Sequence, residues 1–261
     1  MPVHQVPRVD RIERDPLERG GPVVIAGGAH EIPAVGRWTV PYLKQRMGGV
    51  EVTHKRSRNR QHPDFTAPTI KDWFATGRGP FGELLDAMTT GPADARARLL
   101  FTGDEHPLVK RRDGVTTESP ELAALLPDVR VPAVVPADRL YTIWAWFSGA
   151  GVRTWLHYDN NGCHNLNAQV AGRKRAWLFD AALAPRLELF PAGGPNPATN
   201  CSAIDVDDPA RRAQLDALPR WEAELAAGDL LFIPANWLHA FEHLGDFNAN
   251  VNFWWLPAPN P

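Results

Sequence analysis

The chain has 261 residues, of which 44% are hydrophobic and 22% are charged, and its formal net charge is -2. This composition is ordinary for a globular protein with a buried core, and it argues against a disordered chain. The near-neutral balance gives no general attraction to phosphate backbones or anionic lipids. We therefore expect no obligate nucleic-acid partner.

The N-terminal segment and the cysteine content predict a cytoplasmic protein. Residues 1–15 alternate Pro, Arg and Asp without the apolar run of a secretory signal. No segment approaches the about 20 consecutive apolar residues that cross a bilayer. Cys163 and Cys201 are the only cysteines, which does not indicate a disulfide framework. We expect a soluble protein of a reducing compartment with no membrane partner, and the sequence leaves its oligomeric state open.

Residues 1–135 are predicted to form a mixed α/β part. A buried strand over residues 22–26 ends at two glycines, and residues 38–47 favour a helix with Thr39 as its N-cap. Residues 55–63 are basic without apolar periodicity, which indicates an exposed loop that is either a solvated face or a contact for an acidic group. The other expected elements are a strand over 50–53, helical turns over 70–75, 81–88 and 121–126, and a polar connection over 104–114.

Residues 136–261 are predicted to be rich in short strands. Turn residues separate most of these runs, and a density of this kind favours an antiparallel jelly roll. The fold class is therefore mainly β with α decoration, and both parts are expected to form one structural unit. The expected elements are strands over 141–147, 154–159, 166–170, 175–179, 230–234 and 249–255, a loop over 190–199 and a helix over 209–218.

Two histidines and one aspartate are the candidate metal ligands. His157 and Asp159 share a face if their segment is a strand, because alternate side chains of a strand point the same way. His239 follows the run GDLLFIPANWLH, in which a buried strand ends at Pro234. Two imidazoles and one carboxylate on a β scaffold are typical of non-haem Fe(II) oxygenases, whereas zinc sites are usually richer in Cys or His.

These segments resemble a known family. The stretch TWLHYDNNGCHNLNAQVAGRKRAWLF, together with GDLLFIPANWLH and VNFWW, resembles the cupin-like JmjC oxygenases, especially relatives of the asparaginyl hydroxylase that inhibits hypoxia-inducible factor. The opening GGPVVIAGG…GRWTVPYLKQRMGGVEV is similar to the N-terminal part of that group. The resemblance implies a double-stranded β-helix and a dioxygenase that uses Fe(II), 2-oxoglutarate and O2, hydroxylates its substrate and releases succinate and CO2.

The resemblance also assigns roles to single residues. It implies iron ligands at His157, Asp159 and His239, and a clamp for the distal carboxylate of 2-oxoglutarate. The residues implied to bind the cosubstrate are Lys174 with Thr154 at the distal carboxylate, Asn165 and Asn252 along the pocket, and Trp254 beside the metal. The NNGCH segment before Asn165 is two residues longer than the family's usual spacing, so this alignment is looser than that of His157.

Lys174 fits the clamp role on physical grounds as well. A dianionic cosubstrate that chelates iron needs a cation at its far end. Lys174 shares a strand face with Ala176 and Leu178, so its ammonium group needs an anion. The alternative is that Lys174 belongs, with its neighbours Arg173 and Arg175, to a charged hairpin end.

The sequence leaves alternative ligands, cysteine roles and substrates open. His164 and His243 are alternative metal ligands, and Cys163 is either redox-sensitive or a packing residue. The predicted substrate is an amino-acid side chain of a peptide or protein. The alternatives are a free amino acid or natural product, N-demethylation, a metal cupin that does not use 2-oxoglutarate, and a catalytically silent binding module.

Overall fold

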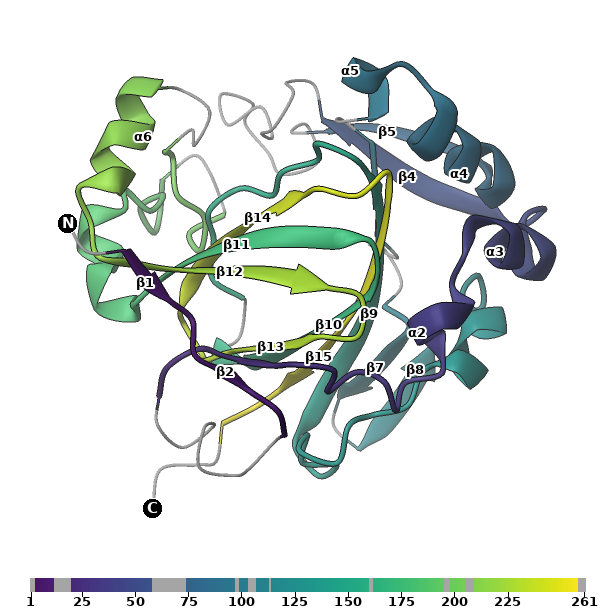
Figure 1. Cartoon of the computed structure of the whole chain (residues 1–261), viewed down its shortest axis with the longest axis horizontal. Coiled ribbons are helices and arrows are strands. Elements are labelled where there is room, and N and C mark those ends of the chain that lie inside the picture. The colour runs from purple at the N-terminus through teal and green to yellow at the C-terminus, as the bar shows by residue number, and fades with distance from the viewer. Residues whose placement is uncertain are drawn as a thin grey trace.

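A computed structural model of the chain describes residues 3–11, 20–57, 74–96, 99–102, 107–112, 114–159, 162–194, 198–204 and 209–257. Two β-sheets face each other and enclose the centre of the molecule, and helices cover the outside (Figure 1). This is the jelly-roll architecture that the short strands predict. Among the described residues no helix is long and apolar enough to cross a membrane.

The larger sheet has 11 strands and is antiparallel apart from one pair. Its centre is the set β13, β10, β15 and β9, in which neighbours in space come from distant parts of the chain. Its strands in spatial order are β2 (Arg8–Val9), β3 (Val23–Ile25), β13 (Leu230–Ile233), β10 (His164–Ala171), β15 (Phe247–Trp255), β9 (Leu140–Gly149), β6 (Leu99–Thr102), β4 (Glu51–Ser57) and β5 (Phe74–Pro80), with β7 (Val109–Arg112) and β8 (Val115–Glu118) beside β9.

The smaller sheet has four strands and lies across the barrel from the larger one (Figure 1). Its order is β1 (Val3–Gln5), β12 (Arg220–Ala226), β11 (Arg173–Phe179) and β14 (Leu238–His243). Residues 151–157 extend this sheet beyond β14 through backbone hydrogen bonds, among them Thr154 N–H to the Phe241 carbonyl at 2.9 Å. Since this segment follows β9 directly, the chain passes from one sheet to the other at Gly149–Gly151.

The two faces of the larger sheet have different chemistry. On one face, apolar side chains such as Phe147, Leu166 and Phe253 join the main hydrophobic core. On the other, inward face, strand pairing lines up polar and aromatic side chains, because Asn165 lies opposite Trp254 and Asn252 lies opposite Trp144. Strict alternation along β10, β15 and β9 therefore separates the core from the interior of the barrel.

The apolar face of the larger sheet is covered by the N-terminal helices. Thr39 caps α3 (Val40–Met47) by accepting a hydrogen bond from Tyr42 N–H, as the sequence predicts. Helix α4 (Phe81–Thr90) packs Phe81 against Phe147 with ring centroids 5.3 Å apart. The remaining helices are α2 (Ala34–Arg37), α5 (Ala93–Arg96), α6 (Pro209–Asp216) and the 3-10 helices η2 (Ala123–Asp128) and η4 (Ala181–Arg186).

The main core cluster contains residues from both sides of residue 135, for example Trp38 from the first part and Phe147 from the second. Trp38 also donates its indole N–H to Asp128 at 3.2 Å. The division into parts 1–135 and 136–261 stays a prediction.

Three sequence expectations need correction. Residues 154–159 form no regular strand, because their backbone alternates between isolated bridges, with His157 paired both to His239 and to Cys201. Residues 55–57 and 74–75, expected as loop and helix, pair with each other as parts of β4 and β5. Residues 109–112, expected as a connection, form β7, which pairs with β9. The remainder of the basic stretch, residues 58–63, lies outside the described residues.

Candidate active site

His157, Asp159 and His239 come together inside the barrel. One ligand atom from each lies within 4.8 Å of the others. His157 and Asp159 come from the segment after β9, and His239 comes from β14. Reciprocal backbone hydrogen bonds of 3.1 and 2.7 Å join His157 and His239, which sets their imidazole centroids 4.5 Å apart. The bridge to β14 therefore places His157 beside His239, although residues 154–159 form no regular strand.

Backbone carbonyls orient both imidazoles. Nδ1 of His157 lies 2.9 Å from the Trp155 carbonyl, and Nδ1 of His239 lies 3.1 Å from the Trp237 carbonyl. Because a carbonyl only accepts, each Nδ1 carries the proton and each Nε2 keeps a free lone pair. The Nε2 atom of His239 lies 3.8 Å from Asp159 Oδ1. This orientation is the one expected of imidazoles that bind a metal.

Burial keeps the two histidines uncharged. Desolvation lowers the pKa of His157 to about 4, and the neighbouring His239 adds to this shift. Desolvation also lowers the pKa of His239 to about 4. For Asp159, desolvation raises the pKa above its ordinary value despite the attraction of His157 and a hydrogen bond from Asn165. At neutral pH both imidazoles can donate a lone pair, and a cation would relieve the cost of burying the carboxylate.

A chain of three amides connects Lys174 to Asp159. Nζ of Lys174 donates to Asn167 at 2.5 Å, and Nδ2 of Asn167 donates to Asn252 at 3.2 Å. Asn252 then donates to Asn165 at 3.1 Å, and Asn165 donates to Oδ2 of Asp159 at 2.8 Å. Lysine can only donate and a carboxylate only accepts, so both ends fix the orientation of every amide between them.

Asn167 and Asn250 are members of this network that the resemblance does not supply. Asn250 donates to Asn252 at 2.5 Å. The Asn-x-Asn spacing of HNLNAQ and NANVNF is the signal that could have identified them, since residues two apart share a strand face. The side-chain amide of Asn165, which is predicted to line the cosubstrate pocket, hydrogen-bonds to Asp159 and Asn252.

Lys174 is 1% exposed and has no anionic partner among the described residues. Apart from Asn167, its ammonium group contacts the Phe241 ring, 4.4 Å from the centroid. Desolvation holds the pKa of Lys174 well below its ordinary value. The side chain points into the barrel and is not part of a solvated hairpin end. Thr154 is adjacent, since its hydroxyl accepts a hydrogen bond from Phe241 N–H at 2.8 Å.

The two alternative histidines have different surroundings. His164 packs between Phe232 and Trp255, and its Nδ1 accepts a hydrogen bond from Ala235 N–H, away from the triad. His243 is buried opposite Lys174 across the strand pair, and its Nδ1 lies 2.6 Å from the Ser148 hydroxyl. Burial, followed by the charge of Lys174, lowers the pKa of His243 to about 3. His243 therefore belongs to the Lys174 end of the barrel.

Both cysteines are buried and unpaired. Cys163 is 2% exposed, and desolvation raises the pKa of its thiol to about 11. A thiol that stays protonated and inaccessible favours the packing role over the redox role.

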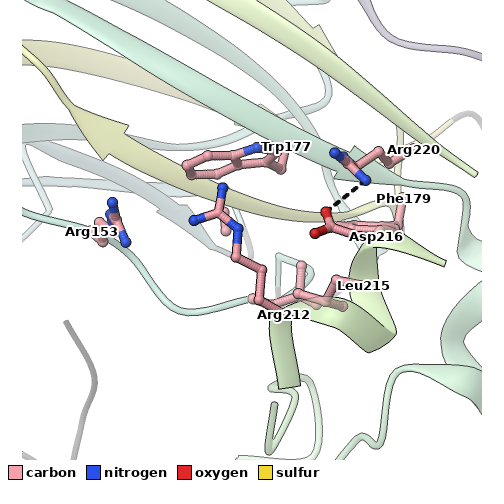
Figure 2. Close-up of a pocket in the computed structure, with 9 residues that line it drawn as sticks. Arg153, Trp177, Phe179, Arg212, Leu215, Asp216 and Arg220 are labelled. Atoms are coloured by element: carbon pink, nitrogen blue, oxygen red, sulfur yellow. Dashed lines mark ion pairs between the residues drawn. The ribbon is translucent and has the colours of Figure 1, made fainter. Parts of the chain in front are cut away.

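A separate hollow lies on the outer face of the smaller sheet, beside α6 (Figure 2). It encloses about 430 Å³, including the part open to solvent, and none of the predicted site residues lines it. Two of its arginines are paired, Arg153 with Glu242 and Arg220 with Asp216. The lining residues are Arg153, Leu156, Trp177, Phe179, Arg212, Leu215, Asp216, Arg220 and Ala240.

The barrel and its inward triad define a cupin. The model of the cupin-like domain family matches residues 9–260, so the chain belongs to that family. This agrees with the JmjC-type resemblance.

Several curated proteins are similar to the chain over most of its length. The tRNA wybutosine-synthesizing protein 5 of Gallus gallus is 29% identical over 99% of this chain and 79% of its own length. The human protein of the same name is 27% identical over 98% of this chain and 79% of its own length. The lysine-specific demethylase JMJ31 of Arabidopsis thaliana is 29% identical over 90% of this chain but only 46% of its own length. Their names describe proteins that synthesise wybutosine in tRNA or demethylate lysine. The finer resemblance to the hypoxia-factor hydroxylase stays a prediction.

Proposed function

We propose that the protein is an Fe(II)- and 2-oxoglutarate-dependent oxygenase that hydroxylates a C–H bond and releases succinate and CO2. The observation that carries the proposal is a buried lysine without an anionic partner in the same barrel as a His-Asp-His cluster. A buried ammonium group is costly unless an anion joins it. A dicarboxylate that binds a metal through one end and Lys174 through the other satisfies both features.

The donor set fits iron. His157 and His239 offer Nε2 atoms and Asp159 offers Oδ1, which together can occupy one face of a six-coordinate ion. Bound Fe(II) supplies the activation of O2 that C–H hydroxylation requires. The protein's part is to hold the ligands. The Trp155 and Trp237 carbonyls fix the imidazoles, and Asn165 fixes the carboxylate.

Lys174 and Thr154 are proposed to bind the distal carboxylate of 2-oxoglutarate. Lys174 provides the charge, and the Thr154 hydroxyl keeps its own proton for donation because it accepts from Phe241 N–H. Asn252 is proposed to position the cosubstrate through the amide chain, and Trp254 borders the metal side of the pocket. His243 stays neutral at this end, so it adds no second positive charge beside Lys174.

The class of substrate is also a proposal. We predict an amino-acid side chain of a peptide or protein, with a free amino acid or natural product as the alternative. The names of the relatives point to tRNA in one case and to lysine in the other. A macromolecular substrate is therefore the shared expectation.

The test is succinate formation from 2-oxoglutarate under air with added Fe(II). We expect His157→Ala to abolish turnover, because one of three metal ligands is lost. Lys174→Ala should retain turnover only at much higher 2-oxoglutarate. The matched controls are His4→Ala and Lys44→Ala, an exposed histidine and a lysine that pairs with Asp86 on the surface. Both controls should behave like the unaltered protein.

If the unaltered protein makes no succinate, direct binding of Fe(II) and 2-oxoglutarate should be measured, because idle turnover can require the prime substrate. Metal binding without 2-oxoglutarate binding would favour a metal cupin of another type. If the protein binds neither Fe(II) nor 2-oxoglutarate, a silent binding module would be favoured.

A further inference from the structure

The hollow beside α6 has an indole ring in its wall. Along β11, Ala176 and Leu178 join the core between the sheets, so Trp177 points to the outer face. Trp177 is half-buried and lies opposite Ala240 of β14 in the strand pairing. The aliphatic floor is closed to a ligand, because Leu156 and Ala240 are only 0% and 1% exposed. The Trp177 ring is therefore the main apolar surface that a ligand in the hollow can reach.

Two of the three arginines around the hollow are neutralised by acids. Arg220 pairs with Asp216 at 3.0 Å and with Glu222 at 2.7 Å. Arg153 pairs with Glu242 at 2.6 Å. Asp216, which is the acid of the lining, is thus engaged by Arg220, as the dashed line in Figure 2 marks. These pairs leave little net charge on their side of the hollow.

Arg212 is the third arginine, and it has no ion-pair partner in the part of the chain that the structure describes. Its side chain is exposed, and Figure 2 shows it reaching from α6 toward the Trp177 ring. An exposed arginine alone is an ordinary surface feature. A guanidinium group beside an accessible indole ring is a more specific pair, because its N–H donors match a carboxylate while the indole face stacks on a ring.

We propose that the hollow is a second ligand site, which binds a small aromatic carboxylate. The ring of the ligand lies against Trp177, and its carboxylate pairs with Arg212. The enclosed space of about 430 Å³ includes the part open to solvent, so it suits a single ring better than a large cofactor. A cationic ligand is disfavoured, because the one charge without a counter-charge among the described lining residues is positive.

The smaller sheet separates this site from the candidate metal centre. Leu156 and Ala240 line the hollow, whereas their chain neighbours His157 and His239 belong to the triad inside the barrel. Successive side chains of an extended backbone point to opposite faces, which explains this division. The site therefore requires neither iron nor the oxygenase function proposed above, and its ligand should bind without contacting Lys174.

The test is a titration of the metal-free full chain with benzoate, followed by the NMR signals of the ligand. Benzamide, which has the ring without the charge, and acetate, which has the charge without the ring, are the comparison probes. Benzoate should bind more tightly than either. Arg212→Met should weaken benzoate binding by about 3- to 10-fold and leave benzamide binding unchanged. Arg211→Met, at the preceding residue of α6, which pairs with Glu188, is the matched control and should change neither.

A second variant separates the ring from the charge. Trp177→Leu should lower the affinity for benzoate to that for acetate and leave acetate binding unchanged, because only the stacking surface is lost. Circular dichroism of each variant checks that the fold is retained.

Three outcomes would overturn the proposal. The first is benzamide or acetate binding as tightly as benzoate. The second is a natively folded Arg212→Met that binds benzoate as Arg211→Met does. The third is loss of benzoate binding in Lys174→Ala, which would place the anion inside the barrel. Since the titration uses neither iron nor turnover, its failure leaves the proposed oxygenase function intact, and failure of the succinate assay leaves this site intact.

Discussion

Asn165 donates a hydrogen bond of 2.8 Å from its side-chain amide to Oδ2 of Asp159. This contact leaves Oδ1 facing His239 and holds the carboxylate in one orientation. Asn165→Leu should therefore weaken metal binding by about 10- to 100-fold, the usual effect of losing an outer partner of a ligand. Metal titration followed by calorimetry measures this. Gln169→Leu, on the same strand face but outside the amide chain, is the control, and an equal loss in both variants would contradict the prediction.

Lys174→Met should separate stability from cosubstrate binding. The substitution removes a buried, unpaired ammonium group and keeps an unbranched chain against Phe241, so we expect a higher melting temperature without ligands. Binding of 2-oxoglutarate in the presence of metal should become much weaker. Thermal unfolding with and without 2-oxoglutarate reports both effects. Lys44→Met, at an exposed ion pair, should change neither, and a lower melting temperature of Lys174→Met would argue against an unpaired charge.

The metal-free protein should lose stability in mild acid. His157, His239 and His243 have pKa values lowered to about 4, about 4 and about 3. Each therefore binds its proton more readily in the unfolded chain, where the pKa is about 6.5. Their contribution is complete above that value and declines as the pH falls toward the folded values, by at most about 1.4 kcal/mol per pH unit for each group.

Urea unfolding at a series of pH values between 7 and 4 tests this. His243→Asn removes one of the three groups. It should therefore reduce the dependence of the unfolding free energy on pH by the equivalent of one bound proton. A free energy of unfolding that stays constant over this range would show that the histidines bind protons as readily in the folded chain as in the unfolded chain.

Gly172→Ala should destabilise the hairpin between β10 and β11. Gly172 has φ +74°, and an added Cβ would lie 2.3 Å from the Phe247 carbonyl oxygen. Gly114 has φ +77° with nothing within 4 Å, so Gly114→Ala isolates the backbone cost of about 1–2 kcal/mol. Gly172→Ala should cost more, as measured by urea unfolding. Equal costs in the two variants would mean that the Phe247 backbone moves freely.

The strongly patterned strands could be predicted from the sequence. Alternation marks residues 166–170 and 249–255, and the structure confirms both within β10 and β15. Strand β12 has the sequence RWEAELA, whose charged residues resemble a helix surface, and β5 contains two glycines and a proline. These strands form because neighbouring strands supply hydrogen bonds, and tertiary context of this kind overrides local preference.

The candidate site likewise contains features that the sequence predicts and features that depend on tertiary context. Spacing along the sequence singles out His157 with Asp159, and the run GDLLFIPANWLH singles out His239. The hydrogen bond from Asn165 to Asp159 could not be predicted, since an amide next to a metal ligand and an amide next to a cosubstrate have the same sequence signature. The place of His243 beside Lys174 depends on the register between β11 and β14.

The amide chain has a consequence for how the two ligands affect each other's affinity. Lys174, Asn167, Asn252, Asn165 and Asp159 form one directional series of donors and acceptors. An anion that draws Lys174 away from Asn167 frees an acceptor at one end, and a cation that engages Asp159 polarises the donors at the other. We therefore expect the proposed metal and cosubstrate sites to share a coupling free energy. By reciprocity, whatever factor the metal adds to cosubstrate affinity, the cosubstrate should add to metal affinity.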